Sequence, residues 1–138
     1  MRILIINGPN LNLLGKREPH LYGTRSFDDY FRELQTRYAD VELTCKQSNH
    51  EGDLIDWLQQ AEDTADGVIL NAAAYTHTSI ALRDTVAAIC TPVVEVHITD
   101  ISRREPFRRI SLLHDVCNAT VMGKGLKGYE EALQILLS

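Results

Sequence analysis

Ile3-Leu4-Ile5-Ile6 is a wholly apolar run that ends directly in the turn residues Asn7-Gly8-Pro9-Asn10. A short run without polar residues is typical of a β-strand that is covered on both faces, as in the middle of a parallel sheet. Similar short strands are expected further along the chain, over residues 41–45, 67–70, 93–96 and 118–122.

Segments with helical periodicity separate these strands. Ser26 can cap a helix, with Asp29 at the capping-box position, and the apolar stripe of that helix is Phe27, Tyr30, Phe31, Leu34 and Tyr38. Further helices are expected over residues 53–65 and 79–89, and a last one carries Tyr129, Ala132, Leu133, Leu136 and Leu137 on one face. Alternating strands and helices predict an α/β fold in which helices cover both faces of a parallel sheet. At 138 residues, the prediction is one flavodoxin-like domain, a three-layer sandwich with a five-stranded parallel sheet.

Composition and charge narrow the classes of partner. Hydrophobic residues make up 44% of the chain and charged residues 24%, and the net charge is −5. These values exclude a disordered chain, and an acidic domain is a poor candidate for binding nucleic acid or an anionic membrane. An anionic ligand would have to be attracted by a local basic cluster.

The cysteines and the apolar segments indicate the compartment. Cys45, Cys90 and Cys117 are odd in number and form no C-x-x-C pair, so we expect buried free thiols in a reducing cytosol. No segment approaches the roughly 20 apolar residues that span a bilayer, and the first apolar run is too short for a signal peptide. The sequence therefore predicts a cytoplasmic protein with no membrane partner.

Four loops follow the carboxyl ends of the expected strands, where ligands bind in sheets of this kind. They cover residues 7–25, 47–52, 71–78 and 97–109. The first is unusually long and has no apolar period. It contains Arg17 and Tyr22, so it is either a surface loop with a solvated Lys16-Arg17 pair or a lid that brings a cation and a phenol over the strand ends. It lacks the P-loop pattern, and no G-x-G-x-x-G motif occurs in the chain.

Two later loops carry histidines. Asn71 ends the third strand and His77 precedes the next helix, where a histidine is either a catalyst or, more often, a local hydrogen-bonding residue. Glu95 and His97 are two residues apart on the fourth strand, so both side chains point to the same side of the sheet. A carboxylate beside an imidazole can fix its tautomer and suit it to general acid catalysis. A satisfied pair near a buried edge is an equally good interpretation of the spacing alone.

The remaining candidates are metal ligands and arginines. The five histidines form no H-E-x-x-H motif or close-set pair, so no metal site is predicted. The basic stretch over residues 103–109 could be a nucleic-acid patch, a solvated face or an anion clamp. In an acidic domain, one short cluster of arginines at a ligand-binding edge favours a clamp for a small carboxylate or phosphate, with at least two of the four arginines simply solvated.

Taken together, the loop sequences resemble one family. The motifs are residues 7–23, Gln47-Ser-Asn-His-Glu-Gly52, residues 71–79, Glu95-Val-His-Ile98 and Arg104-Glu-x-Phe-Arg108. They resemble the type II 3-dehydroquinate dehydratases in order, spacing and chain length. The resemblance implies a flavodoxin-like hydro-lyase that converts 3-dehydroquinate to 3-dehydroshikimate in the shikimate pathway, which leads to chorismate and the aromatic amino acids. It also implies that no metal or cofactor takes part and that the chain assembles as a homododecamer, a tetramer of trimers.

The resemblance also assigns roles by motif position. Tyr22 would be the base at C2 of the substrate, Arg17 would lower the pKa of that phenol, and His97 would be the acid for the leaving hydroxyl. Glu95 would orient His97, and Asn10 would stabilise the enolate through a bound water. Substrate-binding positions match the following residues: Asn71, His77, Ile98, Thr99, Arg108 and Asp84, the last of which would reach the site of a neighbouring subunit. The lysines lie in polar or loop settings, which argues against an imine mechanism.

The chain departs from the commonest family pattern at Ala72, where Pro is usual, and at Thr99-Asp100, where Ser-Asn is usual. We expect Asp100 to pair locally or to point away from the substrate carboxylate. Two other classes of function were weighed. A flavodoxin-like domain that senses a small carboxylate would explain the fold but not the joint presence of Arg17, Tyr22 and a Glu-paired His97. A redox enzyme would need a glycine fingerprint that is missing here.

Overall fold

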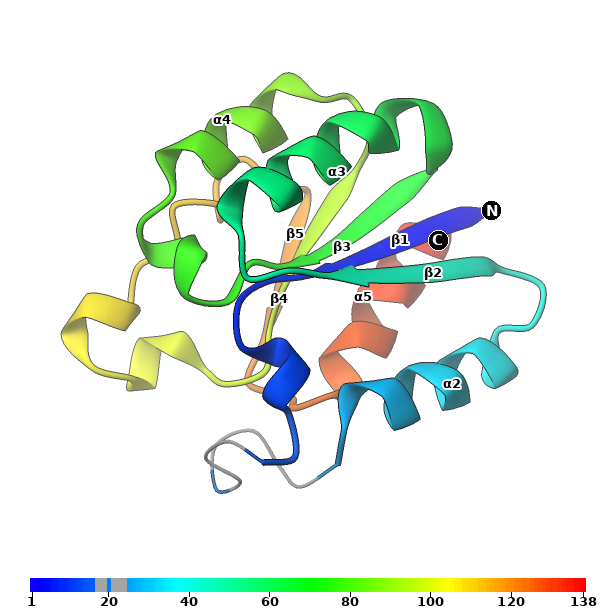
Figure 1. The fold of residues 1–138 in the computed structure, drawn as a ribbon, viewed down its shortest axis with the longest axis horizontal. Helices are drawn as coiled ribbons and strands as arrows, with labels where there is room; N and C mark the ends of the chain where they lie inside the picture. Colours follow the sequence, from blue (N-terminus) through cyan, green and yellow to red (C-terminus); the bar gives the residue numbers. More distant parts are fainter. Residues whose placement is uncertain (17–19, 21–24) are drawn as a thin grey trace.

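The computed structural model describes residues 1–16, 20 and 25–138. Within these residues, five parallel strands form one sheet in the order β2-β1-β3-β4-β5 (Figure 1). The strands are β1 (Arg2–Asn7), β2 (Glu42–Gln47), β3 (Gly67–Asn71), β4 (Val93–His97) and β5 (Ala119–Met122). This doubly wound order is that of the flavodoxin-like fold, as the sequence predicted.

Helices cover both faces of the sheet. In Figure 1, α3 (Glu51–Thr64) and α4 (Ile80–Ala88) lie on one face, and α2 (Phe27–Arg37) and α5 (Lys127–Leu137) lie on the other. The alternation of side chains along β1 divides the core accordingly. Ile3 and Ile5 belong to the cluster beneath α2 and α5, while Leu4 and Ile6 belong to the cluster beneath α3 and α4. The apolar run at the start of the chain therefore contributes side chains to both hydrophobic clusters, one on each face of the sheet.

The expected elements are all present, with ends that differ by no more than two residues. The Ser26 hydroxyl accepts from the Asp29 N–H and begins α2, as expected, but the Asp29 carboxylate pairs with Arg32 at 2.7 Å. The first loop is better packed than its sequence indicated. Residues Leu11–Leu13 form a 3₁₀ helix, and Leu11 and Leu14 are buried in the core. The basic stretch forms two 3₁₀ turns, Ile101–Arg103 and Pro106–Arg108.

One expectation about the cysteines was wrong. All three are free thiols, but Cys90 is exposed, and Cys45 and Cys117 are only partly buried. Cys90 follows the end of α4, where the chain turns at the surface before Pro92. For Cys45 and Cys117, burial and nearby carboxylates raise the thiol pKa to about 12, so both stay protonated at neutral pH.

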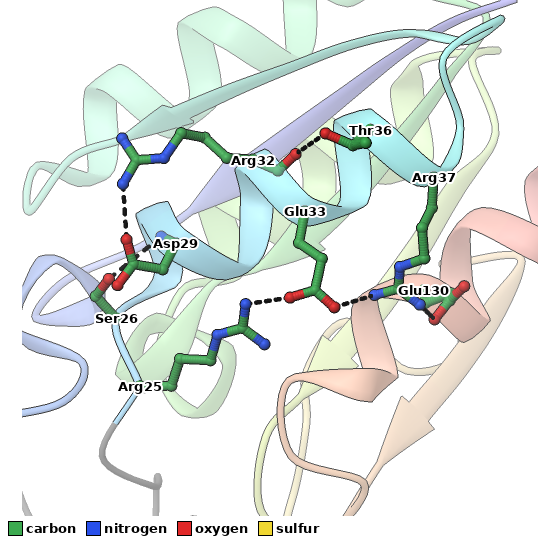
Figure 2. A network of polar contacts seen from close by, with 8 residues as sticks. All are labelled: Arg25, Ser26, Asp29, Arg32, Glu33, Thr36, Arg37 and Glu130. Atoms are coloured by element: carbon green, nitrogen blue, oxygen red, sulfur yellow. Dashed lines mark hydrogen bonds and ion pairs between the residues drawn. The ribbon is translucent and has the colours of Figure 1, made fainter.

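A chain of ion pairs joins the start of α2 to α5 across the surface (Figure 2). Arg25 pairs with Glu33, which also accepts from Arg37 at 3.4 Å. Arg37 reaches Glu130 of α5 at 2.6 Å. Arg25, Glu33 and Arg37 are exposed and Glu130 is partly buried, and ion pairs open to solvent contribute little to stability. They orient Arg25, the last residue of the first loop, whereas the apolar core supplies the stability.

No helix in the described part of the chain is both long enough and apolar enough to cross a membrane.

Candidate active site

A pocket lies at the carboxyl ends of β1, β3 and β4, where the sequence placed the ligand-binding loops. It opens to solvent. Most of the described residues to which the resemblance gives a role line it: Asn10, Asn71, His77, His97, Ile98, Thr99 and Arg108. Arg17 and Tyr22 lie outside the described residues, so their roles remain expectations.

His97 and Glu95 form a buried pair at the end of β4. The imidazole Nε2 lies 2.7 Å from Glu95 Oε2, and the two side chains are 5% and 1% exposed. Their separation by two strand residues puts them on the same side, as expected. Because a carboxylate can only accept, Nε2 carries the proton. The other ring nitrogen, Nδ1, has no partner among the described residues and is the one available to a bound molecule.

The Glu95 carboxylate is held by hydroxyl groups as well as by His97. Thr120 donates to Oε1 at 2.8 Å, and Thr76 and Ser111 contact Oε2. Burial by itself raises the pKa of Glu95 and is the largest single influence. The hydrogen bonds and the charge of the histidine outweigh it and lower the pKa of Glu95 to about 2. Glu95 is therefore ionised at neutral pH.

His77, which also lines the pocket, carries its proton on the opposite ring nitrogen from His97. Its Nδ1 lies 2.9 Å from the Ile110 carbonyl oxygen, which can only accept, so Nδ1 carries the proton. Burial lowers the pKa of His77, as do the charges of His97, Arg108 and Arg104, and together they outweigh the carbonyl. His77 is thus neutral at pH 7, with Nε2 able to accept a hydrogen bond from a ligand hydroxyl.

Asn71 is fixed from below by α5. Its Nδ2 donates to the Tyr129 hydroxyl at 2.9 Å, and its Oδ1 accepts from the Ala73 N–H at 3.1 Å. The same hydroxyl donates to Asn7 Oδ1 at 2.8 Å. Tyr129 therefore ties the carboxyl ends of β1 and β3 together under the pocket. The two strands also approach closely above it, since a Cβ on Gly8 would lie 2.6 Å from the Ala72 carbonyl oxygen.

Asn10 reaches the pocket from a left-handed backbone conformation, with φ at 69°. Asparagine tolerates this region better than most residues. The Asn10 N–H donates to Asn49 Oδ1 at 3.0 Å, which anchors the turn to the loop after β2. The Asn10 carboxamide has no hydrogen-bond partner among residues 1–16, 20 and 25–138, so it can serve a ligand or a water.

The four arginines of the basic stretch divide into two pairs. Arg104 and Arg108 are partly buried and line the pocket, whereas Arg103 and Arg109 are exposed and lie outside it. Arg104 donates to the Thr99 hydroxyl at 3.2 Å, and Arg108 pairs with Glu105 at 3.2 Å. Two arginines that line one pocket are compatible with a ligand that carries a carboxylate.

The structure also places the two acidic residues, Asp100 and Asp84, for which the sequence led to an expectation. Asp100 pairs locally, as expected: its Oδ1 accepts from the Ser102 N–H at 3.0 Å and the Ser102 hydroxyl at 2.6 Å. Asp84 is exposed on α4 and does not line the pocket of its own chain. Among the described residues, no group of three or more His, Cys, Asp or Glu side chains could hold a metal ion.

Four residues that the structure brings to the site were not predicted from the sequence. Arg104 lines the pocket, although the sequence could not distinguish it from its neighbouring arginines. Thr76, Ser111 and Thr120 surround Glu95, and only Thr76 adjoins a residue that was singled out. Thr120 could have been found by aligning the expected strands, because it lies beside Glu95 in the β4–β5 register.

Comparisons with known proteins agree with this geometry. The family described as Dehydroquinase class II matches residues 1–137. A 3-dehydroquinate dehydratase from Exiguobacterium is 58% identical over 138 residues, which cover 99% of this chain and 94% of that protein. One from Tolumonas auensis is 51% identical over 134 residues, 96% of this chain and 88% of that protein. The crystal structure of the type II dehydroquinase from Butyrivibrio crossotus is 45% identical, with a TM-score of 0.94, and the match covers 100% of this chain and 98% of that one.

Fold, pocket and relatives together define an enzyme of the hydro-lyase class, a dehydratase on a flavodoxin-like scaffold. More particularly, the chain belongs to the class II dehydroquinase family.

Proposed function

We propose that the protein removes water from 3-dehydroquinate to give 3-dehydroshikimate, the step of the shikimate pathway that leads towards chorismate and the aromatic amino acids. The relatives that carry the name 3-dehydroquinate dehydratase support this substrate. The observation that carries the proposal is the buried His97–Glu95 pair, because it leaves one protonatable nitrogen facing a pocket lined by two arginines.

The elimination starts with a proton at C2, which the neighbouring ketone acidifies. We assign its removal to Tyr22, on the family resemblance, and the electron pair of the broken C–H bond moves to the ketone oxygen as an enolate. A free tyrosine titrates near pH 10, so about 4 kcal/mol of preference for the phenolate is needed to bring its pKa to about 7. A nearby guanidinium in a water-poor site can provide much of this, and Arg17 is assigned that role.

The enolate then expels the hydroxyl at C1. Its electron pair returns to form the C1–C2 double bond, and the C1–O bond breaks. Protonated His97 delivers its Nδ1 proton to the departing oxygen, so water leaves rather than hydroxide. Glu95 keeps the other nitrogen, Nε2, occupied throughout. The Tyr22 proton returns to solvent and His97 takes up another, which restores the enzyme.

The other pocket residues bind and orient the substrate in this proposal. Arg108 holds the ring hydroxyls and the carboxylate region, together with the backbone N–H groups of Ile98 and Thr99. His77 accepts from a ring hydroxyl at Nε2, because its Nδ1 proton is committed to the Ile110 carbonyl. Asn10 stabilises the enolate through a water. No step requires a cofactor.

We also propose that the chain works in the cytoplasm as a homododecamer, a tetramer of trimers. Asp84 is exposed on α4, outside its own pocket, and is free to enter the site of a neighbouring subunit. Exposed Ile80 lies one helical turn before it on α4. Sedimentation that gives only a fully active monomer at micromolar concentration would contradict this assembly.

The experiment that tests the activity follows the ultraviolet absorbance of the conjugated enone product. Purified protein, 3-dehydroquinate and a chelator should give a prompt rise, and Tyr22→Phe should abolish the rise while binding persists. A flat trace from folded wild-type protein would overturn the proposal. It would favour the alternative, a domain that binds a small carboxylate.

A further inference from the structure

Glu95 makes more hydrogen bonds than its pairing with His97 requires. Oε2 lies 2.7 Å from His97 Nε2 and is also contacted by Ser111 and, at 3.1 Å, by Thr76. Oε1 accepts from Thr120 at 2.8 Å. The three hydroxyls come from the turn after β3, the segment after the basic stretch and β5. Three separate parts of the chain thus converge on one buried carboxylate.

The protons around Glu95 can be counted. A threonine hydroxyl has one proton, and Thr120 gives it to Glu95, so the contact of 2.9 Å between Thr120 Oγ1 and His114 Nδ1 places a proton on that nitrogen. The hydroxyl oxygens of Thr76 and Ser111 lie 2.9 Å apart. Their two protons are distributed between the hydrogen bond that joins the two hydroxyls and the hydrogen bonds to Glu95 Oε2. Every neighbour therefore points a donor at Glu95 or can do so, and none offers it an acceptor.

We propose that Thr120, Ser111 and Thr76 are positioning residues that hold Glu95 as a fixed acceptor, so that His97 keeps its proton on Nε2 and presents Nδ1 to the pocket. This rests on the proposed function, in which the Nδ1 proton of His97 reaches the leaving hydroxyl. Each oxygen of an ionised carboxylate has two lone pairs; Oε2 faces three groups that can donate and Oε1 accepts from Thr120, so a proton on either oxygen would face another donor. The low pKa of Glu95 agrees with this arrangement.

The three hydroxyl residues act through Glu95 rather than on the substrate. None of them lines the pocket, whereas His97 does. Thr120 is the only described donor to Oε1, so its loss leaves that oxygen buried without a partner. The carboxylate can then rotate away from His97, and the ring is free to move its proton to Nδ1.

The first test compares Thr120→Val, which removes only the donor, with Thr120→Ser, which keeps it. In steady-state dehydration of 3-dehydroquinate, we expect Thr120→Val to lower kcat by about 10- to 100-fold, the range for losing a hydrogen bond to a charged group. KM should change by less than about threefold because the pocket lining is intact, and Thr120→Ser should recover most of kcat. Thr85→Val is the matched control, since the Thr85 hydroxyl also makes a partly buried hydrogen bond but donates only to the Ala81 carbonyl in its own helix.

The second test reads the histidine directly. In protein labelled with ¹⁵N in its imidazole rings, wild-type His97 should show the tautomer protonated at Nε2, and Thr120→Val should shift it towards a mixture. This readout needs no turnover. If the wild type fails to dehydrate 3-dehydroquinate, the proposed function is overturned while the nuclear magnetic resonance experiment still decides the positioning role.

The proposal is overturned if Thr120→Val keeps the wild-type kcat and tautomer, if Thr120→Ser is impaired as much as Thr120→Val, or if Thr85→Val loses as much activity. Should Thr120→Val fail to fold, Ser111→Ala applies the same criteria to the other carboxylate oxygen, Oε2.

Discussion

Replacing Tyr129 with phenylalanine removes one hydroxyl group from beneath the pocket and leaves the ring in place. The Tyr129 side chain is fully buried, and its hydroxyl bonds Asn7 Oδ1 at 2.8 Å and Asn71 Nδ2 at 2.9 Å. Asn7 and Asn71 are themselves 1% and 3% exposed. Water therefore cannot readily replace the missing group, and two amide atoms lose their partner.

The magnitude follows from these two contacts. A buried polar atom that loses its hydrogen-bond partner costs about 1–3 kcal/mol, and two such atoms are created. We expect the free energy of unfolding to fall by about 2–6 kcal/mol. Because Asn71 also caps the Ala73 N–H, the floor of the pocket should loosen and kcat/KM should fall as well.

Tyr38 offers a matched control. Its hydroxyl also makes two hydrogen bonds, donating to Glu130 Oε2 at 2.9 Å and accepting from Gln134 Nε2 at 3.0 Å, but these lie at the surface. Water can serve both partners, so Tyr38→Phe should cost less than about 1 kcal/mol.

The assay is urea unfolding followed by circular dichroism, with all proteins at one concentration because the proposed assembly would contribute to the measured stability. An equal loss in Tyr129→Phe and Tyr38→Phe would refute the argument that the hydroxyl bridge between β1 and β3 is dry and stabilising. So would a Tyr129→Phe variant as stable as the wild type.

Two other expectations concern acid stability and backbone contact. The pKa of Glu95 is about 2 in the folded chain, against an ordinary value of 4.5. The ionised carboxylate therefore stabilises the fold fully above pH 4.5, and this stabilisation is lost as the pH falls towards 2. Glu95→Gln should flatten this part of the curve of unfolding free energy against pH. An unchanged slope in that variant would contradict the assignment. Gly8→Ala should lower the thermal midpoint and activity, because its Cβ would lie 2.6 Å from the Ala72 carbonyl oxygen. Gly52→Ala, with no atom within 4 Å of its Cβ, should instead stabilise α3 by up to about 1 kcal/mol, and equal effects of the two changes in calorimetry would contradict this reasoning.

The fold could be predicted because its signals are local. The apolar run of β1 and the helical stripe of α2 each specify an element within a few residues, and short alternating elements allow few arrangements other than a doubly wound parallel sheet. The juxtaposition of Glu95 and His97 was predictable for the same reason, since it depends only on the two-residue repeat of a strand.

Other features were visible in the sequence only as alternatives. Four arginines stand close together in the basic stretch, and their spacing does not say which two enter the pocket. That choice depends on how two 3₁₀ turns direct the side chains. The exposure of Cys90 likewise depends on the course of the turn after α4. The number and spacing of the cysteines had instead predicted that this thiol is buried.

The sequence by itself determined the elements, their order, the edge of the sheet where the pocket lies and the pairing of Glu95 with His97. Only the tertiary structure decided what surrounds that pair and supports the pocket: hydroxyls from three separate segments on Glu95, and Tyr129 joining Asn7 and Asn71 across 122 and 58 residues of chain. The physical reason is range. A period of two or 3.6 residues can be recognised from side chains that are close together in the sequence. A hydrogen bond between distant segments exists only after the sheet and its helices have packed.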